Sequence, residues 1–165
     1  HYTSVNARVI TVAPETINSD DYAEDEDTTA YDNAVAAAFQ DALTKAKGFY
    51  DSWVAEGAGE EKFIELFNTN SSDLSAEDGL YENIARGQFV VKDLDSWLYD
   101  PARQPGDYTL IEGDVNIYVA YFVGEGEQYS TYLSREDMQK DDYAAWVESL
   151  GEGTISKKWT YALAE

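Results

Sequence analysis

The sequence predicts an α+β fold, in which helices flank a small antiparallel sheet of about four strands and a helical extension follows at the C-terminus. Two observations carry this prediction. Short runs rich in β-branched residues, typical of strands, occur near the start of the chain and again after residue 107. Between them lie longer stretches in which apolar residues recur at helical spacing. Separate groups of strands and helices favour a sheet covered by helices.

The first strand is predicted over residues 5–12, because this run alternates and is rich in Val and Ile. Ala13-Pro14 ends it, and an acidic loop is expected over residues 15–31. A calcium site is the alternative for this loop, but the loop lacks the regular carboxylate spacing and central Gly of an EF-hand, so we expect it to be solvated. No cofactor is expected, and the only histidine, His1, is not proposed as a metal ligand.

Two helices are predicted next. Asp32 is expected to cap a helix over residues 33–55, because Asp is a favoured N-cap residue. Glycines at 57 and 59 end it, and a second helix is expected over residues 60–68. The stripe of apolar residues on the first helix is expected to face the core, and it comprises Val35, Phe39, Ala42, Leu43, Ala46, Phe49, Tyr50, Trp53 and Val54.

The middle of the chain is predicted to be a polar loop over residues 68–79, followed by a short helical turn over residues 80–85. Another short helix is expected over residues 93–99, with its apolar side chains pointing inward. Those side chains are Leu94, Trp97 and Leu98.

Two strands are predicted to form a hairpin. They cover residues 108–112 and 115–123, and Gly113-Asp114 is a favoured two-residue connection between strands. We expect the hairpin to complete a first domain over residues 1–126.

A C-terminal extension over residues 127–165 is expected to pack on this domain. Ser134 and Asp137 have the spacing of a capping box, which predicts a helix there. Its aromatic residues are expected to cover the first domain, and they are Tyr129, Tyr132, Tyr143, Trp146, Trp159 and Tyr161.

Composition and charge restrict the function. The chain has 165 residues and a formal net charge of −22, which makes nucleic acid and anionic membrane surfaces unfavourable partners and attracts cationic peptides. It has no cysteine, which excludes thiol catalysis and disulfides. No apolar run approaches the roughly 20 residues that cross a bilayer.

Several short motifs occur in a characteristic order. The most specific stretch runs from Gly87-Gln88-Phe89-Val90 to Arg103-Gln104-Pro105-Gly106-Asp107. Other matching segments are Ala7-Arg8-Val9-Ile10-Thr11-Val12, Ser71-Ser72-Asp73, Asp78-Gly79-Leu80-Tyr81, Asp95-Ser96-Trp97-Leu98-Tyr99-Asp100 and Asn116-Ile117-Tyr118-Val119-Ala120-Tyr121-Phe122. In order and spacing these motifs resemble the parvulin-type (rotamase) peptidyl-prolyl cis-trans isomerase domain, over residues 5–124. The resemblance is to extracytoplasmic parvulin-like domains of Gram-positive gut bacteria.

The resemblance implies a proline pocket and assigns candidate residues to it. Asp73 occupies the position that faces the reacting amide, and Phe89 replaces the pocket Met. Leu94 falls near the position of the pocket Phe, and Trp97 follows on the same short helix. Phe89, Leu94 and Trp97 are therefore expected to bind substrate.

Both signature histidines of the family are replaced, by Val9 and Tyr118, and the Thr of their network corresponds to Gly113. Val9 has no donor, whereas the hydroxyl of Tyr118 could reach Asp73. Asp73 and Tyr118 are thus the candidate catalytic residues.

Three functions follow as alternatives. The first is a degenerate parvulin-like domain that binds extended polypeptide as a foldase or chaperone, with weak or no catalysis. The second is an active isomerase that uses Asp73 and an apolar proline pocket, and the third is a non-catalytic scaffold or interaction module at the cell surface.

The expected partner is unfolded or proline-containing polypeptide of basic character, together with flanking domains of a longer chain. No preference for phosphopeptides is expected, because an acidic loop replaces the basic cluster that phosphate recognition needs. We expect an extracytoplasmic location, at the cell surface or anchored to the membrane through a segment outside this sequence.

Overall fold

The computed structural model describes residues 3–22, 28–89 and 91–128, together with five single residues further on. Contacts divide the chain into two units, one formed by Thr3–Gly126 and the other by His1–Tyr2 with Glu127–Glu165. The predicted capping box at Ser134 and Asp137 lies outside the described residues. The five single residues are helical, and they are Thr131, Lys140, Tyr143, Trp146 and Val147.

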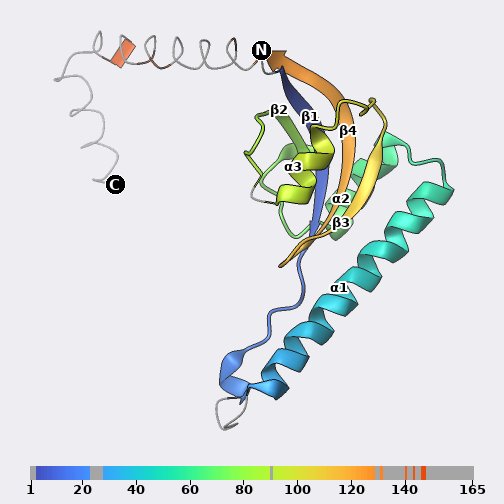
Figure 1. Cartoon of the computed structure of the whole chain (residues 1–165), viewed down its shortest axis with the longest axis vertical. Helices are drawn as coiled ribbons and strands as arrows, with labels where there is room; N and C mark the ends of the chain where they lie inside the picture. The colour runs from blue at the N-terminus through green and yellow to red at the C-terminus, as the bar shows by residue number, and fades with distance from the viewer. Residues whose placement is uncertain are drawn as a thin grey trace, which may run out of the picture. The chain divides into compact units, whose positions relative to one another are not determined.

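A four-stranded antiparallel sheet forms the centre of the unit Thr3–Gly126, which confirms the predicted fold class. The strands lie side by side in the order β2-β1-β4-β3, so the first and last of the four described strands are the two central ones (Figure 1). Their bounds are Thr3–Val12 for β1, Leu80–Ile84 for β2, Tyr108–Glu112 for β3 and Ile117–Gln128 for β4.

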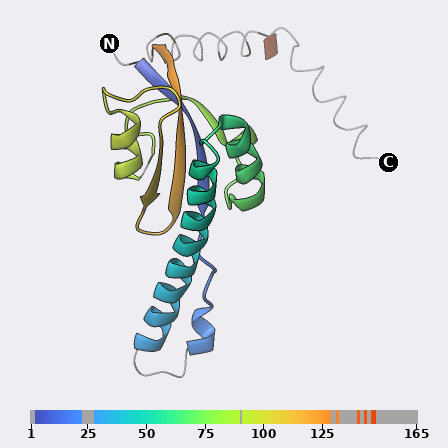
Figure 2. The same ribbon diagram turned by 90° about the vertical axis from the view of Figure 1, so that its right-hand side faces the viewer.

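Helices cover both faces of the sheet (Figure 2). On one face lie α1, Thr29–Ala55, and α2, Glu60–Asn70; on the other lies α3, Lys92–Leu98. Two short 3₁₀ turns, Ser19–Tyr22 and Glu77–Gly79, complete the described elements. None of the helices in the described ranges is both long enough and apolar enough to cross a membrane.

The central strand β1 contributes side chains to both cores, because successive residues of a strand point to opposite faces. Ile10 and Val12 pack into the cluster beneath α1 and α2, which includes Trp53 and Phe63. The α3 face receives the alternate residues of β1 and the inward face of α3, in a cluster made of Val5, Ala7, Val9, Ile84, Leu94, Leu98, Ile111, Ala120 and Phe122.

Arg8 ties β1 to the elements beside it. Its Nε donates to Glu60 Oε1 at 2.8 Å, and its Nη1 donates to the carbonyl oxygen of Asp78 at 2.8 Å. Asp78 has a left-handed backbone, with φ of 52°. The guanidinium therefore fixes the start of α2 and the turn before β2 to the same point of the sheet.

The prediction of a helical turn over residues 80–85 is wrong, because this segment is strand β2. It pairs with β1 through Ala7–Tyr81 and Arg8–Leu80, and the register shifts between Val5 and Ala7. The strand is specified by this pairing with a distant segment, because its own residues, Leu-Tyr-Glu-Asn-Ile, show no regular alternation of apolar and polar side chains.

The hairpin connection is longer than predicted. The last paired residues are Glu112 and Ile117, so the turn spans residues 113–116. It closes with a hydrogen bond from Gly113 N to Asn116 O at 3.0 Å. Val115, expected at the start of the strand, lies in the turn and is 70% exposed.

Helix α1 begins earlier than the sequence indicates. Its N-cap is Thr28, and no side chain caps it. Asp32, the predicted cap, lies in the first turn and accepts a hydrogen bond from the Thr28 hydroxyl at 3.2 Å. Asp is favoured as an N-cap and also in the first turn, where its carboxylate faces the positive end of the helix dipole. Asp32 therefore does not fix the first residue of the helix, and the predicted boundary was too late.

Candidate functional site

A cavity of about 500 Å³ lies on the α3 face of the sheet. Three regions of the chain enclose it: the second half of β1, the segment that leads into β2 and continues towards α3, and the start of β4. Its volume is within the range of ligand pockets, roughly 300–1,000 Å³. The lining residues are Val9, Thr11, Ala13, Ser72, Asp73, Tyr81, Gln88, Phe89, Val91, Asn116 and Tyr118.

Three of the five predicted site residues line this cavity, namely Asp73, Phe89 and Tyr118. Leu94 does not, because it is fully buried beneath the cavity, in the cluster that joins α3 to the sheet. Trp97 also lies outside the lining. Its ring is covered by Arg103, whose Cζ is 4.1 Å from the ring centroid.

The carboxylate of Asp73 is held in place by its own loop and by β2. Ser75 N donates to Asp73 Oδ1 at 2.9 Å, and the Tyr81 hydroxyl donates to Oδ2 at 3.2 Å. The Ser71 hydroxyl donates to the carbonyl oxygen of Asp73 at 2.7 Å. These bonds orient one carboxylate at the cavity wall.

The predicted contact between Tyr118 and Asp73 is replaced by another. The hydroxyl of Tyr118 accepts a weak hydrogen bond from Asn116 Nδ2 at 3.4 Å, and Tyr81 is the tyrosine that reaches Asp73. Because Ala7 faces α3 and pairs with Tyr81 across the strands, Tyr81 faces the same side. Tyr81 was not among the residues selected from the sequence, because only its pairing with Ala7 shows on which face of the sheet its ring lies.

Hydrogen bonds from Ser75 lower the pKa of Asp73, with a further contribution from Tyr81, while partial burial opposes them. Because the pKa of Asp73 is lower in the folded than in the unfolded state, its ionised carboxylate stabilises the fold at pH values above the unfolded-state pKa. This contribution is lost as the pH falls through the folded-state pKa. We expect an NMR titration of Asp73 to have its midpoint below the ordinary value of 3.8. In Tyr81→Phe the midpoint should move part of the way up, because the bonds from Ser75 remain. A midpoint at or above the ordinary value would contradict this geometry.

Aromatic rings form much of the cavity wall. The rings of Tyr81 and Phe89 meet edge to face, with centroids 5.5 Å apart, and Tyr118 adds a third ring. Burial raises the pKa of the Tyr81 hydroxyl, so it remains a donor at neutral pH. The arrangement combines apolar aromatic surface with one oriented carboxylate.

The ring of Tyr118 requires glycine at position 113. A Cβ placed on Gly113 would lie 2.9 Å from Tyr118 Cε2 and 2.9 Å from Asn116 O, both closer than real contacts allow. Gly113 thus fits both the tight hairpin turn and the tyrosine ring. A Thr at this position, where the resembled family carries one, would require the turn or the Tyr118 ring to shift.

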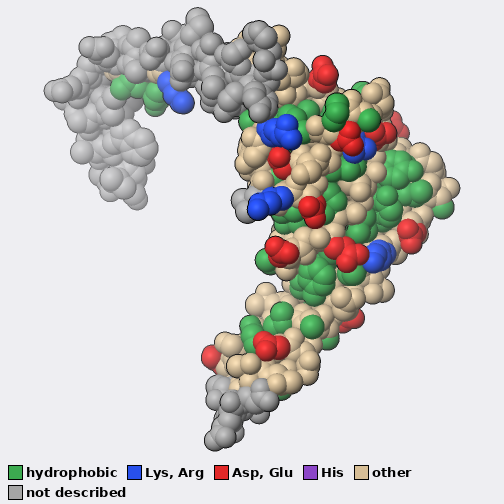
Figure 3. Space-filling model, viewed as in Figure 1, with side chains coloured by type: hydrophobic (Ala, Val, Ile, Leu, Met, Phe, Trp, Pro, Cys, Tyr) green, Lys and Arg blue, Asp and Glu red, His purple; other side chains and the backbone are tan. Residues whose placement is uncertain are grey.

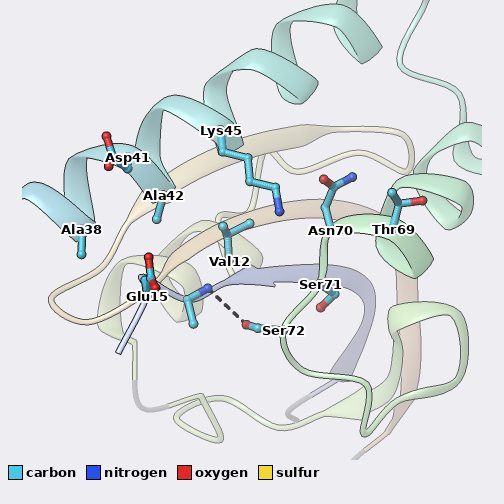
Figure 4. A pocket seen from close by; sticks show the side chains of 11 residues that line it. Val12, Glu15, Ala38, Asp41, Ala42, Lys45, Thr69, Asn70, Ser71 and Ser72 are labelled. Carbon is cyan, nitrogen blue, oxygen red and sulfur yellow. Dashed lines mark hydrogen bonds between the residues drawn. The ribbon is translucent and has the colours of Figure 1, made fainter. Parts of the chain in front are cut away.

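A second cavity, of about 410 Å³, lies on the α1 face near the end of β1. Lys45 extends from α1 towards Asn70 at the end of α2, and the cavity is also lined by Glu15 and Asp41 (Figure 4). Ser72 also lines this cavity, and its hydroxyl accepts a hydrogen bond from Ala13 N, just after the end of β1, at 3.2 Å. The hydroxyl of Ser72 is therefore engaged in the backbone network of the fold.

No protein-family model, curated protein or solved structure matches the chain. No group of residues in the described ranges has the composition and proximity of a metal site.

Proposed function

We propose that Thr3–Gly126 is a divergent parvulin-like domain that binds extended, proline-containing polypeptide in the cavity on the α3 face, with weak or no isomerisation. The order of elements is consistent with this resemblance, from an initial strand through two helices and a short helix to a final hairpin.

One observation carries the proposal. The resemblance marks six functional positions in segments far apart in the chain, occupied here by Val9, Asp73, Phe89, Leu94, Gly113 and Tyr118. Four of them, Val9, Asp73, Phe89 and Tyr118, line the same cavity, whereas Leu94 and Gly113 do not. Unrelated positions would have no reason to converge on a ligand-sized cavity, so their convergence supports both the resemblance and the location of the site.

The chemistry of X-Pro rotation explains why binding is favoured over turnover. The barrier is about 20 kcal/mol and comes from amide resonance, so no covalent step is needed. A catalyst must hold the proline in an apolar site and stabilise the twisted amide more than the planar one. Val9 offers no polar atom behind the amide, and the only bond of the Tyr118 hydroxyl within the described chain is to Asn116. The walls for binding are present without the family's polar network.

Removal of the Phe89 ring should weaken peptide binding. We expect Phe89→Ala to lower the affinity for a labelled proline pentapeptide by about tenfold, because the contact between its ring and the bound peptide is lost. Fluorescence anisotropy would measure this. Phe39→Ala makes the same deletion at a half-buried Phe on α1 and should leave the affinity unchanged. Equal affinities of the wild type and both variants would place binding elsewhere.

An active isomerase is the alternative, and the position of Asp73 at the cavity wall favours it. The relevant measurement is the relaxation rate of a proline peptide after a solvent jump, with and without the protein. For weak or no isomerisation, the relaxation time should stay at or close to the uncatalysed value of tens to hundreds of seconds. Acceleration that disappears in Asp73→Ala would establish the alternative instead.

A further inference from the structure

Among the described residues, the lining of the cavity on the α3 face holds one carboxylate and no basic side chain. Asp73 is its ionisable acidic group, and the described lining contains neither Lys nor Arg. The carboxylate accepts hydrogen bonds from an amide and a hydroxyl, both neutral donors. An oriented carboxylate without a cation beside it favours a cation from the ligand.

The aromatic wall points to the same ligand chemistry. Rings attract cations through their negative faces, and Lys and Arg stems pack well on aromatic surface. Tyr81 belongs to both features, because its ring contacts Phe89 and its hydroxyl holds Asp73. Aromatic rings beside one carboxylate form the usual recognition site for an ammonium or guanidinium group.

The rest of the molecule supports a cationic partner. The chain carries a net charge of −22, which draws positive peptides towards it over distances beyond direct contact. On the face seen in Figure 3, the few Lys and Arg side chains lie among Asp and Glu and form no continuous basic area. A basic peptide therefore meets no extended repulsive surface there.

We propose that the cavity selects polypeptides in which Lys or Arg adjoins the proline. Asp73 takes the cationic head group, and Tyr81, Phe89 and Tyr118 contact its stem and the proline ring. This inference rests on the proposed function and adds its specificity. A cavity of about 500 Å³ has room for the side chains of two neighbouring residues.

The test compares labelled pentapeptides with Arg, Lys, Gln or Glu before the proline, by fluorescence anisotropy. We expect Arg and Lys to bind about tenfold more tightly than Gln, and Glu to bind most weakly. Asp73→Asn should bring the Arg peptide to the level of the Gln peptide and leave the Gln peptide unchanged. This variant keeps the size of the side chain and the acceptor for Ser75 N, so the fold should persist.

Asp41→Asn is the matched control, because it makes the same substitution at an exposed carboxylate of the second cavity. It should leave the preference for Arg intact, which separates local recognition from the overall negative charge. A preference that survives Asp73→Asn would overturn the inference. N-acetylarginine amide alone should bind much more weakly than the peptide; equal binding would also overturn it, in favour of a small cationic ligand.

The same experiment distinguishes failure of the cation preference from failure of the proposed peptide binding. If all four peptides bind equally and Phe89→Ala weakens them all, the peptide site stands and its cation preference is wrong. If no peptide binds to the folded wild type, the proposed function itself fails.

Discussion

Trp53→Ala is expected to lower the free energy of unfolding by about 3–5 kcal/mol, the range for removal of a large aromatic residue from a core. Trp53 is 1% exposed near the end of α1. Its ring centroid lies 5.0 Å from that of Tyr108 on β3 and 5.3 Å from that of Phe63 on α2. One side chain thus joins two helices to the sheet, and its loss leaves a cavity that none of them can close alone.

Urea denaturation followed by circular dichroism would measure this loss, with Trp53→Phe as the control. The control keeps a ring in the core but removes the hydrogen bond from Trp53 Nε1 to Gly59 O, now 2.9 Å long. We expect it to cost about 1–2 kcal/mol, since the carbonyl of Gly59 loses one of its two donors and keeps the other, Phe63 N, while the packing is only partly lost. A loss below about 1 kcal/mol in Trp53→Ala would mean that the core repacks around the gap.

The parts of the fold that the sequence predicted correctly are those with a strong local signal. The strand over residues 108–112 has its predicted bounds, and α1 ends at Ala55 as expected, because glycine follows shortly after it. Strand β2 had no such signal. Its conformation depends on pairing with Ala7 and Arg8, more than 70 residues earlier, and on the left-handed backbone of Asn83. Local propensity carries no information about such a partner.

The candidate site shows the same division. Asp73, Phe89 and Tyr118 could be selected because short motifs mark their positions without any knowledge of geometry. Tyr81 was missed because its segment was interpreted as helical, which hid the face on which its ring lies. Leu94 was misplaced for another reason. Helical spacing shows that a residue points inward, but it does not distinguish a residue that lines a cavity from one buried beneath it.

The loop that carries Asp73 is fixed at its far end by Gly79, and this glycine gives the second large expected effect. Its φ is +69°, and a Cβ there would lie 2.6 Å from Cδ2 of Phe67. Phe67 is 2% exposed on α2, so its ring has little room to move. We expect Gly79→Ala to lower the free energy of unfolding by about 3 kcal/mol, from left-handed strain of about 1–2 kcal/mol and overpacking of about 1–3 kcal/mol.

Gly57→Ala separates these two causes, because Gly57 also has positive φ, +99°, but no atom lies within 4 Å of the added Cβ. It should show the strain alone. Adding Phe67→Leu to Gly79→Ala should recover part of the overpacking, measured against Phe67→Leu by itself in a double-mutant cycle. Additive losses would show that the ring contact contributes nothing.

Gly79→Ala should also weaken peptide binding, although Gly79 does not line the cavity. Any displacement of the turn moves Asp78, whose carbonyl accepts from Arg8, and with it the segment between Asp73 and Tyr81. The hydrogen bond between those two side chains is one of the two that orient the carboxylate, the other being donated by Ser75 N. Affinity for the Arg peptide should therefore fall in Gly79→Ala and recover with Phe67→Leu, whereas Gly57→Ala should bind as the wild type does. Unchanged affinity in a destabilised Gly79→Ala would mean that the site is positioned independently of this turn.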